Sequence, residues 1–144
     1  MKARLVLDAC VLTSIVNSDD IFHQPCYQFF RERHDEDAVS WVIPGLVMFE
    51  YQATQSRRYP ESNPGKKVFR YAPLFVDKCE LYELTKEFLW KVDELGLYDL
   101  FRNLKGADLV YACIAWVEGI PLVTHDKQFT QYGREIQLMN PCEL

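Results

Sequence analysis

The stretch of residues 104–129, LKGADLVYACIAWVEGIPLVTHDKQF, constrains the fold more than any other part of the chain. Residues 107–118 are apolar on nearly every side, which predicts a helix that is buried all round. Gly119 is expected to end this helix. Residues 120–124 form a short apolar run with Pro121 near its start, which is typical of a strand buried on both faces of a parallel sheet.

Two aspartates flank this helix and strand. From Asp108 to Glu118 a helix covers about 16 Å, because each helical residue adds about 1.5 Å. From Ile120 to His125 a returning strand covers about the same distance, at about 3.3 Å per residue. The helix and the returning strand run in opposite directions over about the same length, so Asp108 and Asp126 are expected at one edge of the sheet. This is the carboxyl edge of the strands, where open α/β sheets bind their ligands.

The rest of the chain alternates short apolar runs with helical patterns, which predicts a three-layer α/β/α domain with a mainly parallel central sheet. Pro25 is interpreted as the first residue of its helix. The apolar face of the helix at 45–57 is assigned to Leu46, Val47, Phe49 and Ala53. Residues 59–67 read as a loop, and 68–75 are ambiguous. The remaining strands are predicted at residues 4–7, 39–43, 80–84 (an edge strand) and 136–139, and the remaining helices at 11–16, 25–33, 85–95 and 127–132.

Length and composition favour one globular domain over residues 1–144. The chain is 49% hydrophobic and 26% charged, a balance typical of a packed domain without membrane spans. Asp8 interrupts the apolar run that begins at Leu5, which argues against a signal peptide. The five cysteines never fall at C-x-x-C spacing and are odd in number, so we expect reduced thiols. A cytoplasmic protein with no membrane association is the resulting expectation.

The charge balance bears on nucleic-acid binding. A net charge of −5 argues against binding by bulk electrostatics but leaves room for a local basic patch. Residues 57–70 contain five basic side chains against the single acid Glu61, which makes them a candidate track for an RNA backbone. An ordinary solvated loop explains the same charges equally well. The five basic residues are Arg57, Arg58, Lys66, Lys67 and Arg70.

Four acids are expected near one sheet edge: Asp8, Glu50, Asp108 and Asp126. Each alone has a structural explanation, because acids favour the first turn of a helix and the turn after a strand. Converging carboxylates repel one another, and the cost is tolerable when they bind a cation or stay partly protonated. Oxygen ligands select hard divalent ions such as Mg²⁺ or Mn²⁺. Such an ion supports hydrolysis of a phosphodiester.

Four sequence blocks resemble the signature blocks of the PIN-domain nucleases, in order. They are LVLDACVL, Pro44 with Glu50 six residues later, LKGADLVYACIA and PLVTHDKQF. The resemblance, which extends to the VapC-type toxin ribonucleases, implies that Asp8, Glu50, Asp108 and Asp126 bind Mg²⁺ or Mn²⁺ and carry out catalysis. It implies a metal-dependent endoribonuclease acting on RNA, commonly the toxin of a toxin–antitoxin pair and commonly a homodimer. Thr124 would be the hydroxyl residue of the T-x-D block.

Two positions depart from this pattern. Cys10 stands where the family usually has serine or threonine, so the support around Asp8 is expected to be looser, because a thiol is a weak hydrogen bonder. The loop at 59–67 is long for a minimal toxin. His125 lies between Thr124 and Asp126 but is set aside as a general base, because neighbouring residues at a strand end point to opposite faces.

Two other functions compete with the nuclease. The first is a catalytically silent PIN-fold module that docks RNA or a protein partner, against which the presence of all four acids argues. The second is a phosphatase of the haloacid-dehalogenase type. That class needs an aspartate two residues after the first one, and Cys10 occupies this position.

Overall fold

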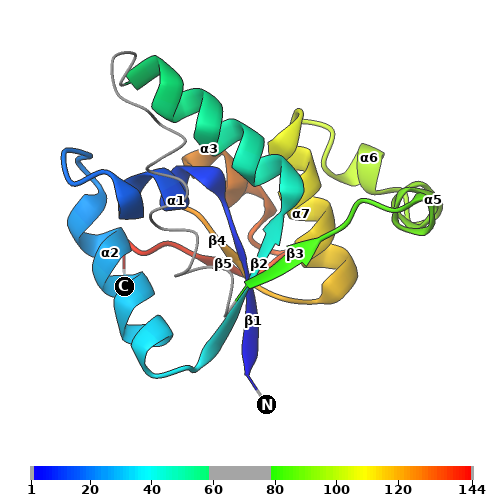
Figure 1. Cartoon of the computed structure of the whole chain (residues 1–144). Coiled ribbons are helices and arrows are strands. Elements are labelled where there is room, and N and C mark those ends of the chain that lie inside the picture. Colours follow the sequence, from blue (N-terminus) through cyan, green and yellow to red (C-terminus); the bar gives the residue numbers. More distant parts are fainter. Residues whose placement is uncertain (1, 59–78, 144) are drawn as a thin grey trace.

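The computed structural model describes residues 2–58 and 79–143, and shows a parallel sheet with helices on both faces. The strand order is β3-β2-β1-β4-β5, and all four pairings are parallel (Figure 1). This arrangement confirms the predicted three-layer α/β/α architecture. The strands are β1 (Ala3–Leu7), β2 (Val39–Pro44), β3 (Cys79–Tyr82), β4 (Leu122–Val123) and β5 (Leu138–Met139).

The helices follow the predicted order with small shifts at their ends. Thr85 caps its helix by accepting a hydrogen bond from the Phe88 backbone N–H, and Gly119 ends another in the left-handed conformation with φ 64°. The end at Gly119 was predicted from the sequence, and so was a helix that begins at Thr85. The helices are α1 (Ala9–Val16), α2 (His23–Asp35), α3 (Gly45–Arg58), α5 (Lys86–Glu94), α6 (Leu97–Leu100) and α7 (Ala107–Glu118), with a 3₁₀ turn η1 (Lys127–Tyr132).

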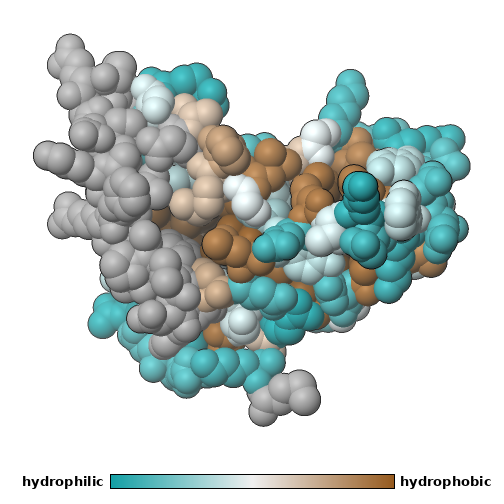
Figure 2. Space-filling view, turned by 45° about the vertical axis from the view of Figure 1, so that its right-hand side comes forward, coloured by the Kyte–Doolittle hydropathy of each residue, from teal (hydrophilic) through white to brown (hydrophobic). Residues whose placement is uncertain are grey.

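Strand β3 lies at one edge of the sheet, as expected, and starts one residue earlier than predicted. On the side where β3 and α5 lie, several large apolar side chains stay exposed, Leu81 by 68% and Trp90 by 63%. Figure 2 shows hydrophobic surface on the side of the molecule that is turned forward. Among the described residues, no helix is long and apolar enough to cross a membrane. The predicted loop at 59–67 and the ambiguous stretch 68–75 lie outside the described residues.

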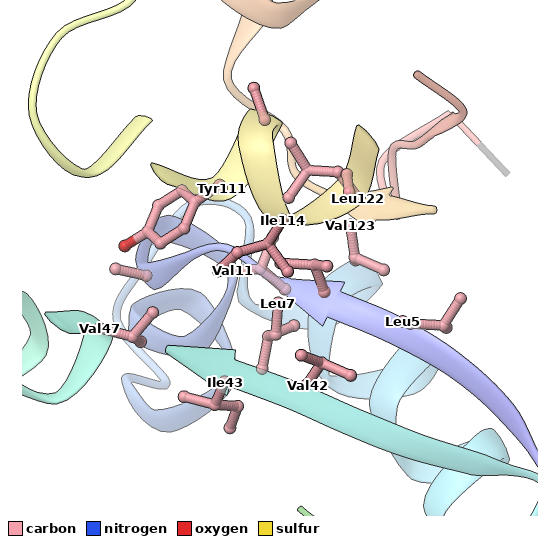
Figure 3. Packing of buried hydrophobic residues seen from close by; sticks show 14 of the residues in the cluster. Leu5, Leu7, Val11, Val42, Ile43, Val47, Tyr111, Ile114, Leu122 and Val123 are labelled. Carbon is pink, nitrogen blue, oxygen red and sulfur yellow. The ribbon is translucent and has the colours of Figure 1, made fainter. Parts of the chain in front are cut away.

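The core forms where helices from different layers meet the sheet. On one face, Phe29 and Phe30 of α2 contact Trp41 of β2, with ring centroids 6.3 and 5.2 Å apart. Helix α7 packs against β1 and β4 on the other face. Figure 3 shows Ile114 of α7 close to Leu7 in the centre of this cluster. The central strand β1 therefore has helices against both of its faces, which explains its run of fully buried residues.

Helix α7 is less buried than its composition predicted. Tyr111 to Ala115 are buried, but Leu109 and Val110 are only partly covered and Trp116 is 39% exposed. The prediction of a helix buried all round was therefore wrong. Because α7 belongs to an outer layer, one of its sides faces away from the sheet.

Helices α2 and α3 also differ from the prediction. Helix α2 begins at His23, two residues before Pro25; a proline fits there because the first-turn N–H groups of a helix have no partner within it. In α3 the buried positions are Val47, Tyr51 and Gln55, spaced four residues apart. Phe49, assigned to the buried face, is 78% exposed, and Ala53 is exposed as well. That assignment followed residue type instead of helical spacing.

Candidate functional site

A cleft of about 810 Å³ lies at the carboxyl end of the central strands and contains all four predicted acids. Asp8 directly follows β1, and Asp126 comes three residues after the end of β4. Glu50 lies on α3, and Asp108 in the first turn of α7. Four segments that are distant in sequence thus bring their carboxylates to one cleft, as the sequence predicted.

Asp8 is the most buried of these acids, with 4% of its surface exposed. The Thr124 hydroxyl donates to its Oδ2 at 2.7 Å, and the Cys10 backbone N–H donates to its Oδ1 at 3.1 Å. Burial raises the pKa of Asp8 to about 6, although these two hydrogen bonds act in the opposite direction. The Asp8 carboxylate also caps helix α1.

Thr124 joins two of the acids. While its hydroxyl donates to Asp8, its oxygen accepts the backbone N–H of Asp126 at 3.0 Å. The Cys10 thiol lies 3.7 Å from the same oxygen. Thr124 and Cys10 therefore both lie in contact with the groups around Asp8. The hydrogen bonds to the Asp8 carboxylate come from the Thr124 hydroxyl and from the Cys10 backbone N–H. The Cys10 side chain donates neither of them, so these two bonds do not depend on whether residue 10 carries a thiol or a hydroxyl.

Glu50 is held by a residue that the sequence analysis did not single out. The Tyr111 hydroxyl donates to Glu50 Oε2 at 2.7 Å, while the Tyr111 ring is fully buried in the core. Figure 3 shows its hydroxyl at the margin of the apolar cluster. Burial, with a contribution from Glu50, raises the pKa of Tyr111, so this group stays a donor. Its position three residues after Asp108, one helical turn on, was the available signal.

A second residue that was missed is Gln128. Its side-chain amide nitrogen donates to Asp108 Oδ2 at 2.6 Å and to Asp126 Oδ2 at 2.8 Å. The pKa of Asp108 is raised by burial first, then by the charges of Asp126 and Glu50, while the bond from Gln128 lowers it. The amide thus offsets repulsion between two carboxylates. The signal was the D-x-Q spacing at the start of η1, where Asp126 also accepts the Gln128 backbone N–H.

His125 lines the same cleft as Asp126, contrary to the expectation that their side chains would point apart. Strand β4 ends at Val123, so the alternation of faces no longer applies at these positions. The His125 Nε2 atom lies 3.1 Å from the hydroxyl of Ser14, which also donates to Asp20 Oδ1 at 3.1 Å. Arg58 forms an ion pair with Asp20 Oδ2 at 3.2 Å.

Of the five basic residues predicted to follow an RNA backbone, two lie within the described part of the chain. Arg57 and Arg58 line the cleft from the last turn of α3, and Arg57 is exposed. Lys66, Lys67 and Arg70 lie outside the described residues.

The donor set suits a hard divalent cation, because the acids in the cleft offer only carboxylate oxygens. Within residues 2–58 and 79–143, however, no three His, Cys, Asp or Glu side chains are grouped closely enough to hold a metal ion as they stand. The charges of Asp126 and Glu50 act on Asp108 and raise its pKa. The Gln128 amide lies between Asp108 and Asp126 and donates to both.

Comparison with known proteins agrees with this geometry. The chain resembles the crystal structure of VapBC2 from Rickettsia felis bound to a promoter DNA fragment, with 18% identity, a TM-score of 0.67 and coverage of 95% of this chain and 98% of that chain. It also resembles PAE2754 from Pyrobaculum aerophilum, with 15% identity, a TM-score of 0.65 and coverage of 99% and 93%. At these identities the likeness concerns the fold alone. Comparison with curated proteins gives no match. The family model described as the PIN domain matches residues 5–135, most of the chain, and the protein therefore belongs to the PIN-domain family.

Proposed function

We propose that this protein is a metal-dependent endoribonuclease that hydrolyses RNA phosphodiester bonds. The observation that carries the proposal is the meeting of Asp8, Glu50, Asp108 and Asp126 in one cleft of a PIN-domain chain. Carboxylates from four separate segments are costly to bring together unless a cation compensates them. Membership of the PIN-domain family supports nuclease chemistry in general.

In this proposal Asp8, Glu50, Asp108 and Asp126 would hold the metal ion through their carboxylate oxygens. When bound there, Mg²⁺ or Mn²⁺ would supply Lewis-acid chemistry, polarising the phosphodiester and lowering the pKa of an attacking water molecule. Tyr111 and Thr124 fix the carboxylates of Glu50 and Asp8, so these ligands keep their positions before the ion arrives. Gln128 donates to both Asp108 and Asp126 and so offsets part of the repulsion between these two carboxylates.

The test is cleavage of a structured RNA by the purified protein with Mn²⁺ or Mg²⁺, and its arrest by a chelator. Asp8→Asn and Asp126→Asn are expected to abolish cleavage while the proteins remain folded. Asp93→Asn, which changes an exposed acid on α5 outside the cleft, serves as the matched control and keeps full activity. Cleavage that survives both substitutions in the cleft would mean that the activity belongs to a contaminant or to another site.

We further propose that the chain acts in the cytoplasm as the toxin of a toxin–antitoxin pair and binds an antitoxin protein. The structural likeness to VapBC2 supports this proposal, at the level of the fold. Expression of this chain alone should then slow growth of the host, and co-expression with the adjacent small open reading frame should restore it. A chain that is harmless at high expression and copurifies with no small protein would favour a housekeeping nuclease.

A catalytically silent binding module is the second candidate, and one observation favours it. Asp108, Asp126 and Glu50 are already engaged by hydrogen bonds from Gln128 and Tyr111, and the acids are not grouped into a ligand set among the described residues. Thermal unfolding with and without Mn²⁺ separates the two functions. The nuclease should be stabilised by the ion, since a ligand that binds only the folded state raises its stability. A silent module with intact hydrogen bonds should be indifferent to Mn²⁺.

A further inference from the structure

The cleft that holds the four acids also contains a pair of aromatic rings. The Phe22 and His125 rings have centroids 4.4 Å apart and planes inclined by 32°. Both residues line the cleft, together with Ile21 from the segment 17–22 that links α1 to α2. Phe22 keeps 37% of its surface exposed, and Ile21 keeps 87%. Apolar surface is thus open to solvent inside a cleft otherwise rich in charged groups.

This ring pair is held in place by hydrogen bonds. The backbone N–H of Phe22 donates to Asp20 Oδ1 at 2.8 Å, which fixes the start of α2. On the other ring, His125 Nε2 lies 3.1 Å from the Ser14 hydroxyl. Because Asp20 also accepts from Ser14, one small network holds both rings. A rigid aromatic surface loses little side-chain entropy when a ligand binds to it.

The charges near the rings indicate what kind of group fits there. Asp19 and Asp20 line this part of the cleft, and the positive charge of Arg58 is paired with Asp20, so a phosphate directly over the rings meets little attraction. A nucleobase is neutral and has two π faces that stack on aromatic side chains. Arg57, exposed on α3 and lining the same cleft, can meet the phosphate of a neighbouring nucleotide.

We propose that the Phe22 ring, backed by the His125 ring, forms a platform on which one unpaired base of the RNA stacks beside the bond that is cut. This inference rests on the proposed ribonuclease function and names the part of the substrate that the cleft recognises. A paired base is already stacked within its helix, so the platform selects single-stranded RNA. Ile21 extends the apolar edge of the platform.

Binding of a labelled single-stranded RNA hexamer, measured by fluorescence anisotropy in chelator, tests the platform without cleavage. Phe22→Ala should weaken binding by about 5- to 100-fold, the loss usual for one stacked base. Phe22→Trp should bind at least as well as the wild type. Tyr27→Ala, which removes a ring of similar exposure, 41%, on the next turn of α2 and outside the cleft, should bind normally. Binding of the same hexamer within a duplex should not respond to Phe22→Ala.

A direct signal comes from the Phe22→Trp protein, whose new indole should be quenched by the hexamer but not by the hexamer with all bases removed. This readout does not depend on the folding of Phe22→Ala. Unchanged affinity of Phe22→Ala, or equal quenching by both hexamers, would overturn the platform. Metal-dependent cleavage by the wild type is measured separately, so cleavage with no effect at Phe22 rejects the platform alone. Base-dependent quenching without cleavage supports the platform and rejects the nuclease.

Discussion

Asp8 carries the clearest pH dependence in the molecule. Its pKa is about 6 in the folded protein against an ordinary value of 3.8, because burial disfavours the charged form. A carboxyl whose folded pKa is raised binds its proton more tightly when folded. Its contribution to stability is therefore greatest below about pH 4 and is lost as the pH rises to about 6. Above that range, the charged form of Asp8 lowers the free energy of unfolding of the metal-free protein by about 3 kcal/mol, because a difference of one in pKa corresponds to about 1.4 kcal/mol.

We therefore predict that Asp8→Asn raises the free energy of unfolding of the metal-free protein at pH 7.5, by up to about 3 kcal/mol. The gain should shrink from pH 6 to pH 4, where Asp8 of the wild type is itself protonated. Urea unfolding in chelator at several pH values measures both proteins. Asp93→Asn controls for the general effect of removing an acid. A variant less stable than the wild type at every pH would show that the hydrogen bonds of Asp8 outweigh the cost of its burial.

Gln128 offers a second residue-scale prediction. Gln128→Glu places a new charge against Asp108 and Asp126, so the metal-free protein should lose on the order of 1 kcal/mol of stability. With saturating Mn²⁺ the variant should gain more stability than the wild type, since a further oxygen ligand is present. Thermal unfolding with and without Mn²⁺ measures both effects. Gln128→Met, which removes the hydrogen bonds without adding a charge, separates charge from bonding. An equal response of all three proteins to Mn²⁺ would argue against a metal site here.

Among the elements, α1 and α3 are joined by a buried pair of amides. Asn17 donates to Gln55 at 2.7 Å, and Gln55 donates back at 3.0 Å. Both side chains are buried, Gln55 completely. Helix α1 begins beside Asp8, and α3 carries Glu50, so this pair sets the relative position of two elements of the site. Buried polar groups in such a pair depend on each other, because neither has water as an alternative partner.

The single substitution Gln55→Leu should therefore destabilise the protein by about 1–3 kcal/mol, because it leaves the Asn17 amide without its partner. The double variant Asn17→Leu/Gln55→Leu should lose less than the sum of the two single losses. Urea unfolding of the four proteins gives the coupling energy as a double-mutant cycle. Strictly additive losses would mean that each amide is satisfied independently of the other.

Elements also show how far the sequence alone predicts this molecule. The carboxyl end of β1 at Leu7 follows from the local pattern, and so does the position of Asp8 beside it, because strand ends and helix starts are encoded by neighbouring residues. Strand β4 spans only Leu122–Val123 of the predicted 120–124. The buried face of α3 could not be read from residue type, since the packing of the sheet decides it. The contacts of Gln128 and Tyr111 join residues 20 and 61 positions apart. Such pairings exist only once the chain has folded.

At the scale of the whole molecule, the side formed by β3, α5 and α6 is a candidate for self-association. It exposes Leu81, Leu89, Trp90, Leu95 and Tyr98, and Figure 2 shows hydrophobic surface on this side. We propose that this side forms the homodimer expected from the family resemblance. Trp90→Glu should then shift the protein from dimer to monomer in size-exclusion chromatography with light scattering. Tyr27→Glu, which changes an exposed ring on α2, should leave the dimer intact. A wild-type protein that is monomeric by light scattering would contradict the proposed homodimer.

The hydrogen bond between Thr124 and Asp8 joins residues 116 positions apart. During translation Asp8 therefore leaves the ribosome long before Thr124, Asp126 and Gln128. A nascent chain that stops between them lacks Asp126, and it also lacks the hydroxyl that donates to Asp8 and the amide that donates to Asp108. The four acids of the cleft can therefore meet only after the segment that carries Thr124 has been made, so an unfinished chain cannot contain the complete site.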